Sequence, residues 1–453
     1  MGIENLLTEV ALYGQTYEVS LNWIGQLIRG LITGVGSVGV GIILFSLILK
    51  FIVMPFDIFQ RISMRKQNLK MRENKEKMEK LQKQYANNKE MYNKKVQEMY
   101  KANGMSVFSS CLPMILSMVI FFVAIGAFND YSTYSTVNNY NQLVKAYDTA
   151  IVDCCDDLTS YQNIDGKITI DTEEAIAYYS LEENYGDKKL TEEYLQGQID
   201  AGKAENRADA VARWIEERAQ EAVVVEYETN VKAKTSFLWI KNIWQTDATY
   251  KSPVADYDDF SMTIYPSSGC GGCSSSGVDF ENEKGEDVSV NDLENGWIYK
   301  AEEYNHVTAK LGEQKNQSNG YYILIVLSIG TILLQQILSS KANKEQQKYS
   351  TVDGQGAGQQ KIMMVVMTGM FAVFSFMYSS AFSIYLIISN VFSLLSTLII
   401  NKLVDKSLEK KAEKAELEKY NRRFAGRAAA TKTNGKVKKV KAYDADKANK
   451  KKK

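Results

Sequence analysis

Five apolar runs dominate the pattern of hydrophobic and polar positions along the chain. They cover residues 35–56, 106–128, 321–340, 361–380 and 381–401. About 20 apolar residues cross the roughly 30 Å of bilayer hydrocarbon at 1.5 Å per residue, and each run has that length and little charge. Pro113 interrupts the second run, and the pair Gln335–Gln336 interrupts the third. The pattern therefore predicts an all-α polytopic membrane protein with five spans, which places the two termini on opposite sides of the membrane.

A polar, helix-forming stretch follows the first run. Residues 57–105 are rich in lysine and contain no proline, and Asn87 and Asn88 suit a turn between two helices. The stretch predicts a helical hairpin in water. A charged hairpin is most often only a solvated helix pair, but the first part of this one is basic. Its basic residues are Arg61, Arg65, Lys66, Lys70 and Arg72.

The N-terminal segment, residues 1–34, ends in an amphipathic pattern. Leu21, Ile24, Leu27, Ile28 and Leu31 recur at helical spacing. One interpretation is a helix lying in the outer membrane interface with its tryptophan near the headgroups, and the other is a surface helix packed on an outer domain. The segment lacks the charged region and cleavage site of a signal peptide, so we expect it to be retained.

Charge is strongly segregated, although the 54 basic and 54 acidic side chains cancel overall. Residues 57–105 hold 13 basic and 6 acidic side chains, and residues 402–453 hold 19 and 7, whereas residues 129–320 hold 16 and 36, a net charge of −20. The positive-inside bias places the basic segments, including the loop 341–360, in the cytoplasm. We therefore expect a bacterial plasma-membrane protein with its N-terminus and acidic block outside and its C-terminus in the cytoplasm.

The acidic block at residues 129–320 is long enough to bury its own core. Residues 171–227 read as two or three helices, and residues 256–300 as short strands and turns around the sequence GCGGC. The block is therefore predicted to be an extracytoplasmic α+β domain inserted between the second and third spans.

Four of the five cysteines lie in this block, at Cys154, Cys155, Cys270 and Cys273. Outside the cell, an even number of cysteines favours disulfides, and the simplest assignment links the first pair to the second. Zinc binding by four thiolates and redox activity at the Cys-Gly-Gly-Cys spacing are the alternatives. The thioredoxin-like βαβ context of a redox motif is absent from the sequence.

Lys50 is the one charge within the first apolar run. A lysine near the middle of a span costs about 2.5–3.5 kcal/mol on insertion scales and usually faces a bundle interior or a wet cavity. It lies five residues before Pro55, so its long side chain could instead reach the cytoplasmic interface. Both interpretations stay open on the residues alone.

Several of these segments together resemble the YidC-type membrane protein insertase family. They are ILKFIVMPFDIFQ, the basic hairpin, GMSVFSSCLPMILSMVIFF and the final pair of spans from KIMMVVMTGMF to LLSTLIIN. The resemblance covers residues 20–129 and 321–401. It implies a five-span insertase core around a hydrophilic groove, open to the cytoplasm and to lipid and closed outside. It also implies a chaperone and insertase without bond chemistry, so no enzyme, cofactor or metal site is expected.

Carried over by position, the groove's basic residue, usually arginine in this family, corresponds to Lys50. Lysine keeps the charge but loses the planar fork that binds carboxylates. The family's polar residue in the second span falls at Ser117, and an aromatic of the fifth span falls at Leu386. The other polar candidates for the groove wall are Ser46, Gln335, Gln336, Ser389 and Asn390. Each of them has a second interpretation, a hydrogen bond to a neighbouring helix.

The partners implied are nascent membrane proteins, membrane lipids and the Sec translocon. The basic tail at residues 402–453 suits ribosomal RNA or anionic lipid, and the resemblance favours the ribosome. No base-reading motif is present, which argues against DNA. The rival classes are a membrane-anchored thiol oxidoreductase or a substrate-binding protein acting through the inserted domain. A secondary transporter would carry more intramembrane charges. We interpret His306, the one histidine, as incidental.

Overall fold

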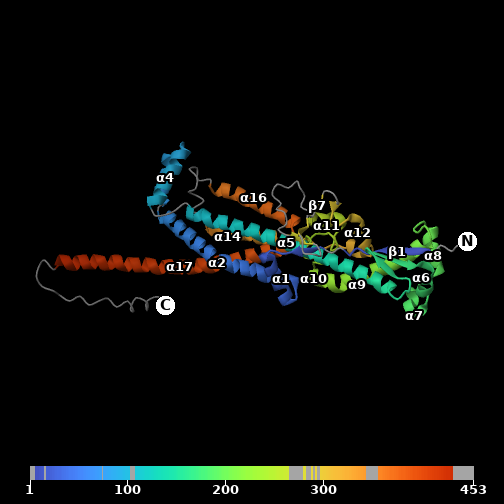
Figure 1. The fold of residues 1–453 in the computed structure, drawn as a ribbon. Coiled ribbons are helices and arrows are strands. Elements are labelled where there is room, and N and C mark those ends of the chain that lie inside the picture. The colour runs from blue at the N-terminus through green and yellow to red at the C-terminus, as the bar shows by residue number, and fades with distance from the viewer. Residues whose placement is uncertain are drawn as a thin grey trace. The chain divides into compact units, whose positions relative to one another are not determined.

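The computed structural model describes residues 6–14, 17–73, 75–102, 108–264, 279–281, 287–288, 291–292, 296–342 and 356–431. The chain divides into two compact units, Met1–Leu394 and Leu395–Lys453. The first unit holds the membrane helices and the acidic domain (Figure 1). In the second unit, the described residues continue the last helix to Thr431.

Five long helices contain the apolar runs: α2 (Val38–Glu73), α5 (Phe108–Cys155), α14 (Ile323–Ala342), α16 (Gly356–Met377) and α17 (Ser380–Thr431). Within the described residues, three stretches are long and apolar enough to cross a membrane, Val38–Phe59, Ile323–Lys341 and Ser380–Ile399. They correspond to the predicted first, third and fifth spans. Met364–Met377 is a shorter apolar helix. In the predicted second span, the side chains of residues 106–118 lie outside the described set.

The 48-residue helix α5 connects the membrane helices to the acidic domain. Figure 1 shows it running from α2 and α14 toward α9 and α12. At 1.5 Å per residue it is about 72 Å long. No glycine or proline follows Gly126, and Tyr140, Val144, Tyr147 and Ile151 recur at helical spacing and are buried in the domain core. The helix therefore passes without a break through residue 129, where the sequence placed a domain boundary.

The N-terminal strand belongs to the acidic domain. Strand β1 (Leu7–Ala11) pairs with β4 (Lys167–Asp171), and β4 pairs with β3 (Gln162–Ile164), so the antiparallel order is β1-β4-β3. Asp165 and Gly166 join β3 to β4 with φ of 51° and 77°, the positive values that a two-residue hairpin turn requires. Thr8 and Val10 point into the core, in register with Ile170 and Ile168.

Short helices complete the domain around α5 and α9 (Arg207–Glu226). At the N-termini of three helices of the domain, the side chain of the preceding residue accepts backbone N–H groups. These residues are Asp171, Thr191 and Asn206. Trp214 of α9 stacks on Tyr179 with ring centroids 4.8 Å apart inside the core. The helices that surround α5 and α9 are α6 (Thr172–Tyr179), α7 (Glu182–Tyr185), α8 (Glu192–Asp200), α10 (Lys232–Thr235), α11 (Tyr257–Ile264), α12 (Ala301–Val307) and α13 (Gly312–Lys315).

Single turns and small strands fill the remainder. The turns are η1 (Gly186–Lys188), the π-helical η2 (Tyr227–Val231) and η3 (Ala309–Leu311). Strands β2 (Glu18–Ser20), β5 (Asp279–Glu281) and β6 (Asp287–Val288) form one sheet, and β7 (Asn291–Asp292) pairs with β8 (Gly296–Trp297). Short strands were expected in residues 256–300. The GCGGC sequence lies outside the described residues.

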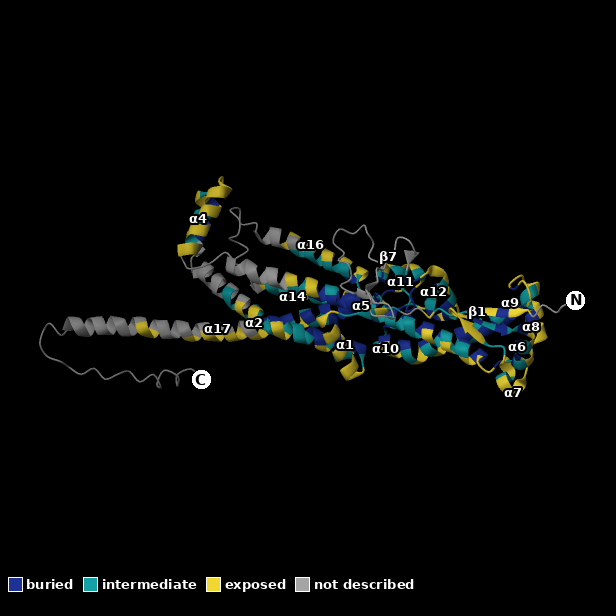
Figure 2. Ribbon diagram, viewed as in Figure 1, coloured by how far each residue is buried: buried dark blue, intermediate teal, exposed yellow. Residues whose placement is uncertain are grey.

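The predicted hairpin is formed by α3 (Lys75–Gln84) and α4 (Lys89–Ala102). The Asn88 side chain accepts the Met91 backbone N–H at 2.9 Å, so the turn lies where the sequence placed it. Met78, Tyr92 and Val96 form a small core between the two helices, while Figure 2 shows α4 exposed along much of its length. The first-span helix α2 continues to Glu73, so the basic residues from Arg61 to Arg72 lie on α2.

The amphipathic segment forms helix α1 (Trp23–Val35). Asn22 caps its N-terminus and also donates to Asp130 of α5 at 2.8 Å, while Gly36 ends it in the left-handed conformation with φ of 73°. Ile28 is buried against α2 and α5, whereas Trp23 is 75% exposed. The helix thus packs on the membrane helices with one face and leaves an apolar residue uncovered on another.

Candidate functional site

A layer of polar side chains lies midway along the apolar helices. The end of each helix that adjoins residues 129–322 is here called its domain end. Counted at 1.5 Å per residue from that end, Lys50 lies about 18 Å into α2, Gln335 about 18 Å into α14 and Asn390 about 15 Å into α17. Thr368 lies about 14 Å into α16 by the same count. These depths are close to half of the roughly 30 Å hydrocarbon thickness.

Lys50 is half-buried on α2, one turn beyond Ser46. Ser46 is fully buried, and its hydroxyl donates to the Ile42 carbonyl at 2.7 Å. The spacing of four residues puts both side chains on one face of the helix. That face of α2 is directed inward at Ser46, whereas Phe51 and Ile52 are exposed on the other side.

Hydrogen bonds connect neighbouring helices within this layer and between the layer and the domain ends. Thr368 of α16 donates to Gln336 of α14 at 3.0 Å, and Asn390 of α17 approaches Thr331 of α14 at 3.5 Å. Closer to the domain end, the hydroxyls of Ser328 and Ser375 lie 3.0 Å apart. Gln336 and Asn390 therefore form hydrogen bonds to a neighbouring helix, which was the second interpretation of these two residues.

The remaining predicted groove residues divide into two groups. Gln335 is half-buried, and Ser389 is buried one turn after Tyr385. The side chains of Ser117 and of the basic group on α2 lie outside the described set. That group is Arg61, Arg65, Lys66, Lys70 and Arg72.

Sequence reasoning missed four members of the polar arrangement, Ser328, Thr331, Thr368 and Ser375. A signal was present, since Ser328, Thr331 and Gln335 are three and four residues apart, and Thr368 and Ser375 are seven apart. These spacings put polar groups on one face of an apolar helix. Serine and threonine in apolar runs are weak signals of a polar site, because each can form a hydrogen bond within its own helix. Thr368 also donates to the Met364 carbonyl in this way.

Aromatic side chains pack the domain half of the helices. Phe45 of α2 meets Phe128 of α5 with centroids 5.5 Å apart, and Phe128 meets Tyr385 of α17 at 5.7 Å. Phe121 of α5 contacts Phe371 of α16 at 5.2 Å. Figure 2 shows buried positions gathered where α1, α2 and α5 meet. The polar layer therefore borders a closely packed apolar region on its domain side.

The segment from Ser236 to Ser252, here called the closing segment, lies across the domain ends of the helices. The backbone N–H of Ala381 donates to the Ile243 carbonyl at 3.0 Å, and that of Ser380 donates to the Gln245 carbonyl at 2.9 Å. The closing segment also contacts α2, because a methyl group built on Gly39 would lie 2.0 Å from the Phe237 ring. It therefore joins the starts of α2 and α17.

Asp247 joins the closing segment to α14. Its carboxylate, 0% exposed, accepts the backbone N–H of Leu324 at 2.6 Å and of Tyr321 at 2.7 Å. Negative charge is favoured at a helix N-terminus, where backbone N–H groups lack partners. Asn319 adds bonds to the carbonyls of Asn242 at 3.0 Å and Thr246 at 2.9 Å.

Cys154 and Cys155 are free thiols, buried at the end of α5. Their predicted disulfide partners, Cys270 and Cys273, lie outside the described residues, so the disulfide pairing stays a prediction. Tyrosines enclose the pair, with the Tyr185 hydroxyl 3.4 Å from the Cys154 sulfur and the Tyr179 hydroxyl donating to Cys155 at 3.6 Å. Burial of this kind shields thiols from reagents in water.

His306 has specific partners in the domain. Its Nε2 lies 3.0 Å from the Tyr147 hydroxyl and 3.6 Å from a carboxylate oxygen of Glu216. Burial raises the pKa of Glu216, and the histidine opposes that shift. Across the described residues, no cluster of three His, Cys, Asp or Glu side chains could hold a metal ion.

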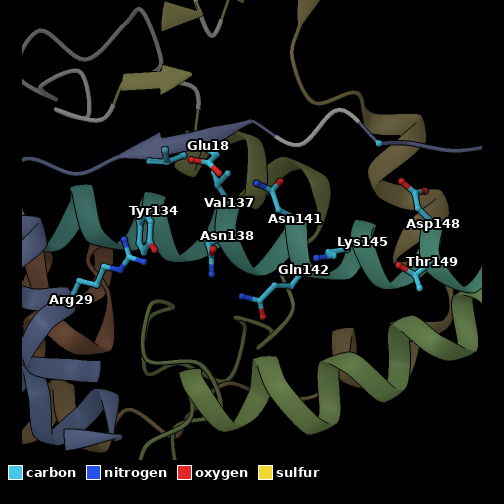
Figure 3. A pocket seen from close by; sticks show the side chains of 12 residues that line it. Glu18, Arg29, Tyr134, Val137, Asn138, Asn141, Gln142, Lys145, Asp148 and Thr149 are labelled. Carbon is cyan, nitrogen blue, oxygen red and sulfur yellow. The ribbon is translucent and has the colours of Figure 1, made fainter. Parts of the chain in front are cut away.

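A cavity of about 520 Å³ lies beside the domain part of α5 (Figure 3). The Arg29 guanidinium lies 5.4 Å from the ring centroid of Tyr134 at one end, and Asp148 lies at the other. Its walls mix positive and negative charges. The lining residues are Gly14, Glu18, Val19, Arg29, Tyr134, Val137, Asn138, Asn141, Gln142, Lys145, Asp148 and Thr149. The cavity is separate from the polar layer, since its α5 residues begin beyond Phe128.

Asp148 is the perturbed carboxylate of this cavity. Burial raises its pKa to about 6, and the Tyr13 backbone N–H, which donates to it at 3.0 Å, opposes the shift. The raised pKa means that burial disfavours the charged form of this side chain.

The chain matches the model of a known family, 60Kd inner membrane protein, over residues 30–159 and 286–407. These stretches include α2, the hairpin, α5 and the apolar helices after the domain, and make up more than half of the chain. The chain belongs to the 60Kd inner membrane protein family. In the 60Kd family match, residues 160–285 are left out, so the unmatched part is shorter than the predicted insertion at 129–320.

Several proteins similar to this chain carry a functional name. The chain is 29% identical over 116 residues to "Membrane protein insertase YidC" of Caldanaerobacter subterraneus subsp. tengcongensis, which covers 26% of this chain and 54% of the relative. Proteins of the same name match from Fusobacterium nucleatum, 32% identical over 20% of this chain and 43% of the relative, and from Clostridium perfringens, 34% identical over 21% and 42%. The chain thus spans about half the length of these relatives. No solved structure matches it.

Proposed function

We propose that this chain is a membrane protein insertase and chaperone, which inserts newly made membrane proteins through a hydrophilic groove within the bilayer. The observation that carries the proposal is Lys50, a charged and half-buried side chain at mid-span depth, with Gln335 and Asn390 at similar depth on two other helices. The family match and the name of the relatives, "Membrane protein insertase YidC", support the same function.

The mechanism is solvation. A polar segment in hydrocarbon leaves its backbone groups unsatisfied, at several kcal/mol for each group. A groove with water and polar side chains to mid-depth shortens the dry path, and the Lys50 ammonium attracts acidic and polar parts of the entering segment. The client's apolar helix then leaves sideways into lipid, and burial of its apolar surface drives the process. No covalent step or cofactor is needed.

The groove opens toward the hairpin and is closed at the domain end. Two observations support this direction. Aromatic side chains fill the space between the helices on the domain side of the polar layer, and the closing segment bonds to the starts of α14 and α17. A client segment therefore enters from the side of α3 and α4.

We infer five spans with the acidic domain outside and the hairpin and tail in the cytoplasm, based on the charge asymmetry between these segments. The basic residues on α2, from Arg61 to Arg72, and the hairpin then meet the nascent chain at the groove entrance. The basic tail binds the ribosome, and the chain works alone or beside the Sec translocon in contact with lipid.

An oxidoreductase acting through the inserted domain is the less favoured function. Its chemistry would need accessible thiols, and the described pair, Cys154 and Cys155, is buried behind tyrosines. Cys270 and Cys273 lie outside the described residues, so this function rests on them alone.

Photo-crosslinking tests the proposed path. A photoreactive amino acid replaces Gln335 in the polar layer or, as a matched control at the same depth, the half-exposed Leu334. Ribosome-bound client chains of increasing length are then irradiated. We expect the client's polar segment to crosslink to position 335 over an intermediate range of lengths and not to position 334. Equal crosslinking at both positions, or none at 335, would contradict a groove.

A further inference from the structure

The closing segment carries a tight turn with an exposed apolar tip. Phe237 and Ile240 exchange two backbone hydrogen bonds, of 2.9 and 3.0 Å, which leaves Leu238 and Trp239 as the central residues. Leu238 has φ of 55° and is 73% exposed. Turns in water place glycine, asparagine or aspartate at positive φ, because other side chains are strained there. A leucine held outward in this conformation is therefore unexpected at an aqueous surface.

Three contacts fix the depth of this turn. Phe237 lies on Gly39, in the first turn of the apolar stretch Val38–Phe59. Ile240 is buried in the cluster that contains Phe45 and Phe382. Ile243 accepts from Ala381 at the start of α17. The turn is thus level with the points where two candidate spans begin.

The other end of the closing segment has the same character. Tyr250 is 61% exposed, and its hydroxyl donates to the Phe376 carbonyl, at the domain end of α16, at 3.5 Å. Tyr321, two residues before α14, is also exposed. Tyrosine and tryptophan gather at membrane interfaces, where the ring meets apolar chains and the polar group meets headgroups.

We propose that the closing segment is a membrane-contact element of the inserted domain, with Leu238 entering the acyl region of the adjacent leaflet and Tyr250 lying among its headgroups. Lipid is the occupant that the geometry favours, because bilayer surrounds the spans at the depth to which Phe237 and Ile243 hold this segment. The contact is apolar.

Tryptophan quenching in proteoliposomes of the full chain tests this contact. Leu238→Trp and Tyr250→Trp are compared with Leu181→Trp, an exposed leucine directly before α7. Figure 1 places α7 at the end of the first unit that is far from α2 and α14. For each variant, the difference in tryptophan fluorescence from the parent protein is measured with lipids brominated near the carbonyl end of the acyl chain. It is measured again with acrylamide on both sides of the vesicle, since this quencher is uncharged and is not repelled by the acidic domain.

We expect a blue-shifted emission at position 238, with quenching by brominated lipid and little by acrylamide, and the reverse at position 181. Position 250 should respond to brominated lipid as well, and it tests the element independently should Leu238→Trp fold poorly. Acrylamide quenching at 238 equal to that at 181 would overturn the proposal. Protection from both quenchers would also overturn it, since a second copy or another protein would then cover the turn.

Discussion

At the scale of single residues, the polar layer contains side chains that hydrogen-bond to neighbouring groups and one charged side chain. Gln336, Asn390 and Ser46 are engaged with neighbouring groups, and only Lys50 adds a charge to the described layer between the helices. A lysine at mid-span costs about 2.5–3.5 kcal/mol on insertion scales. A half-buried lysine at this depth is consistent with the proposed water-filled groove.

The hydrogen bond between Gln336 and Thr368 gives a prediction for stability. Thr368→Val keeps the volume and removes the hydroxyl, so the Gln336 amide loses an interhelical partner. We expect a loss of about 0.6 kcal/mol, in the range found for interhelical hydrogen bonds in membranes. Thermal unfolding in detergent measures it. The double variant Thr368→Val, Gln336→Leu should recover part of the loss, and a loss that the second change deepens would contradict the pairing.

Asp148 gives a prediction for pH. Its pKa is about 6 in the fold against an ordinary value of 3.8, so the folded state holds the proton more tightly. Its stabilising contribution is therefore present below about pH 4 and is lost as the pH rises through 6. Asp148→Asn stays neutral and still accepts from Tyr13. We expect it to stabilise the domain by about 1 kcal/mol at pH 7, allowing for partial exposure, and by nothing near pH 4.

Hydrogen exchange of residues 207–226, which pack on α5, reads out the local stability of this variant. Slower exchange than wild type at pH 7, converging toward pH 4, is the expected result. A variant that exchanges faster at pH 7 would show that the Asp148 carboxylate stabilises the domain while it is charged.

At the scale of elements, the helix starts are held by a segment distant in sequence. The carboxylate of Asp247 takes the place of a local cap for α14, and Gly320 makes room for it, since a methyl group there would lie 1.9 Å from the carboxylate oxygen. The closing segment thus sets the relative heights of α2, α14 and α17.

Asp247→Ala tests the capping role. It leaves the N–H groups of Tyr321 and Leu324 without their acceptor in a buried place. We expect a loss of about 1.5–3 kcal/mol, the value of hydrogen bonds to a charged group. Asp247→Asn keeps an acceptor oxygen and should lose less, as measured by thermal unfolding. If the two variants lose the same, charge at the helix start is the dominant contribution instead.

Gly39 tests the contact between α2 and the closing segment. Gly39→Ala pushes a methyl group into the Phe237 ring and should cost about 1–3 kcal/mol by overpacking. The matched control is Gly126→Ala on α5, where nothing lies within 4 Å, so the substitution should be neutral or stabilising. Similar unfolding temperatures for both variants would mean that Phe237 moves aside freely.

Much of the arrangement could be predicted from the sequence, because membrane spans appear in it as continuous apolar runs. The first, third and fifth spans, the turn at Asn88 and the helix from Trp23 follow from local patterns. The pairing of β1 with β4 and the capping by Asp247 join residues separated by 74 or more positions, and no local pattern signals them. The unbroken course of α5 was missed because a change from apolar to polar composition suggested a boundary.

At the scale of the whole molecule, the proposed insertion activity belongs to the membrane helices, and the inserted domain covers their domain ends. The stretch outside the family match, residues 160–285, contains the closing segment as well as α6 to α9. Because Phe237, Ile243 and Asp247 contact the starts of α2, α17 and α14, removal of the domain is expected to open the domain end of the helix bundle.

The measurement that tests the central claim most directly is complementation with Lys50 variants. A bacterium is depleted of its own insertase, the chain is expressed, and insertion of a short two-span client is followed at matched expression level. If Lys50 stabilises the polar segment in transit by about 1.4 kcal/mol, Lys50→Ala should insert about tenfold more slowly, while wild type and Lys50→Arg both support growth. Full insertion by Lys50→Ala would contradict the account, since the charge in the polar layer would then take no part in moving the client.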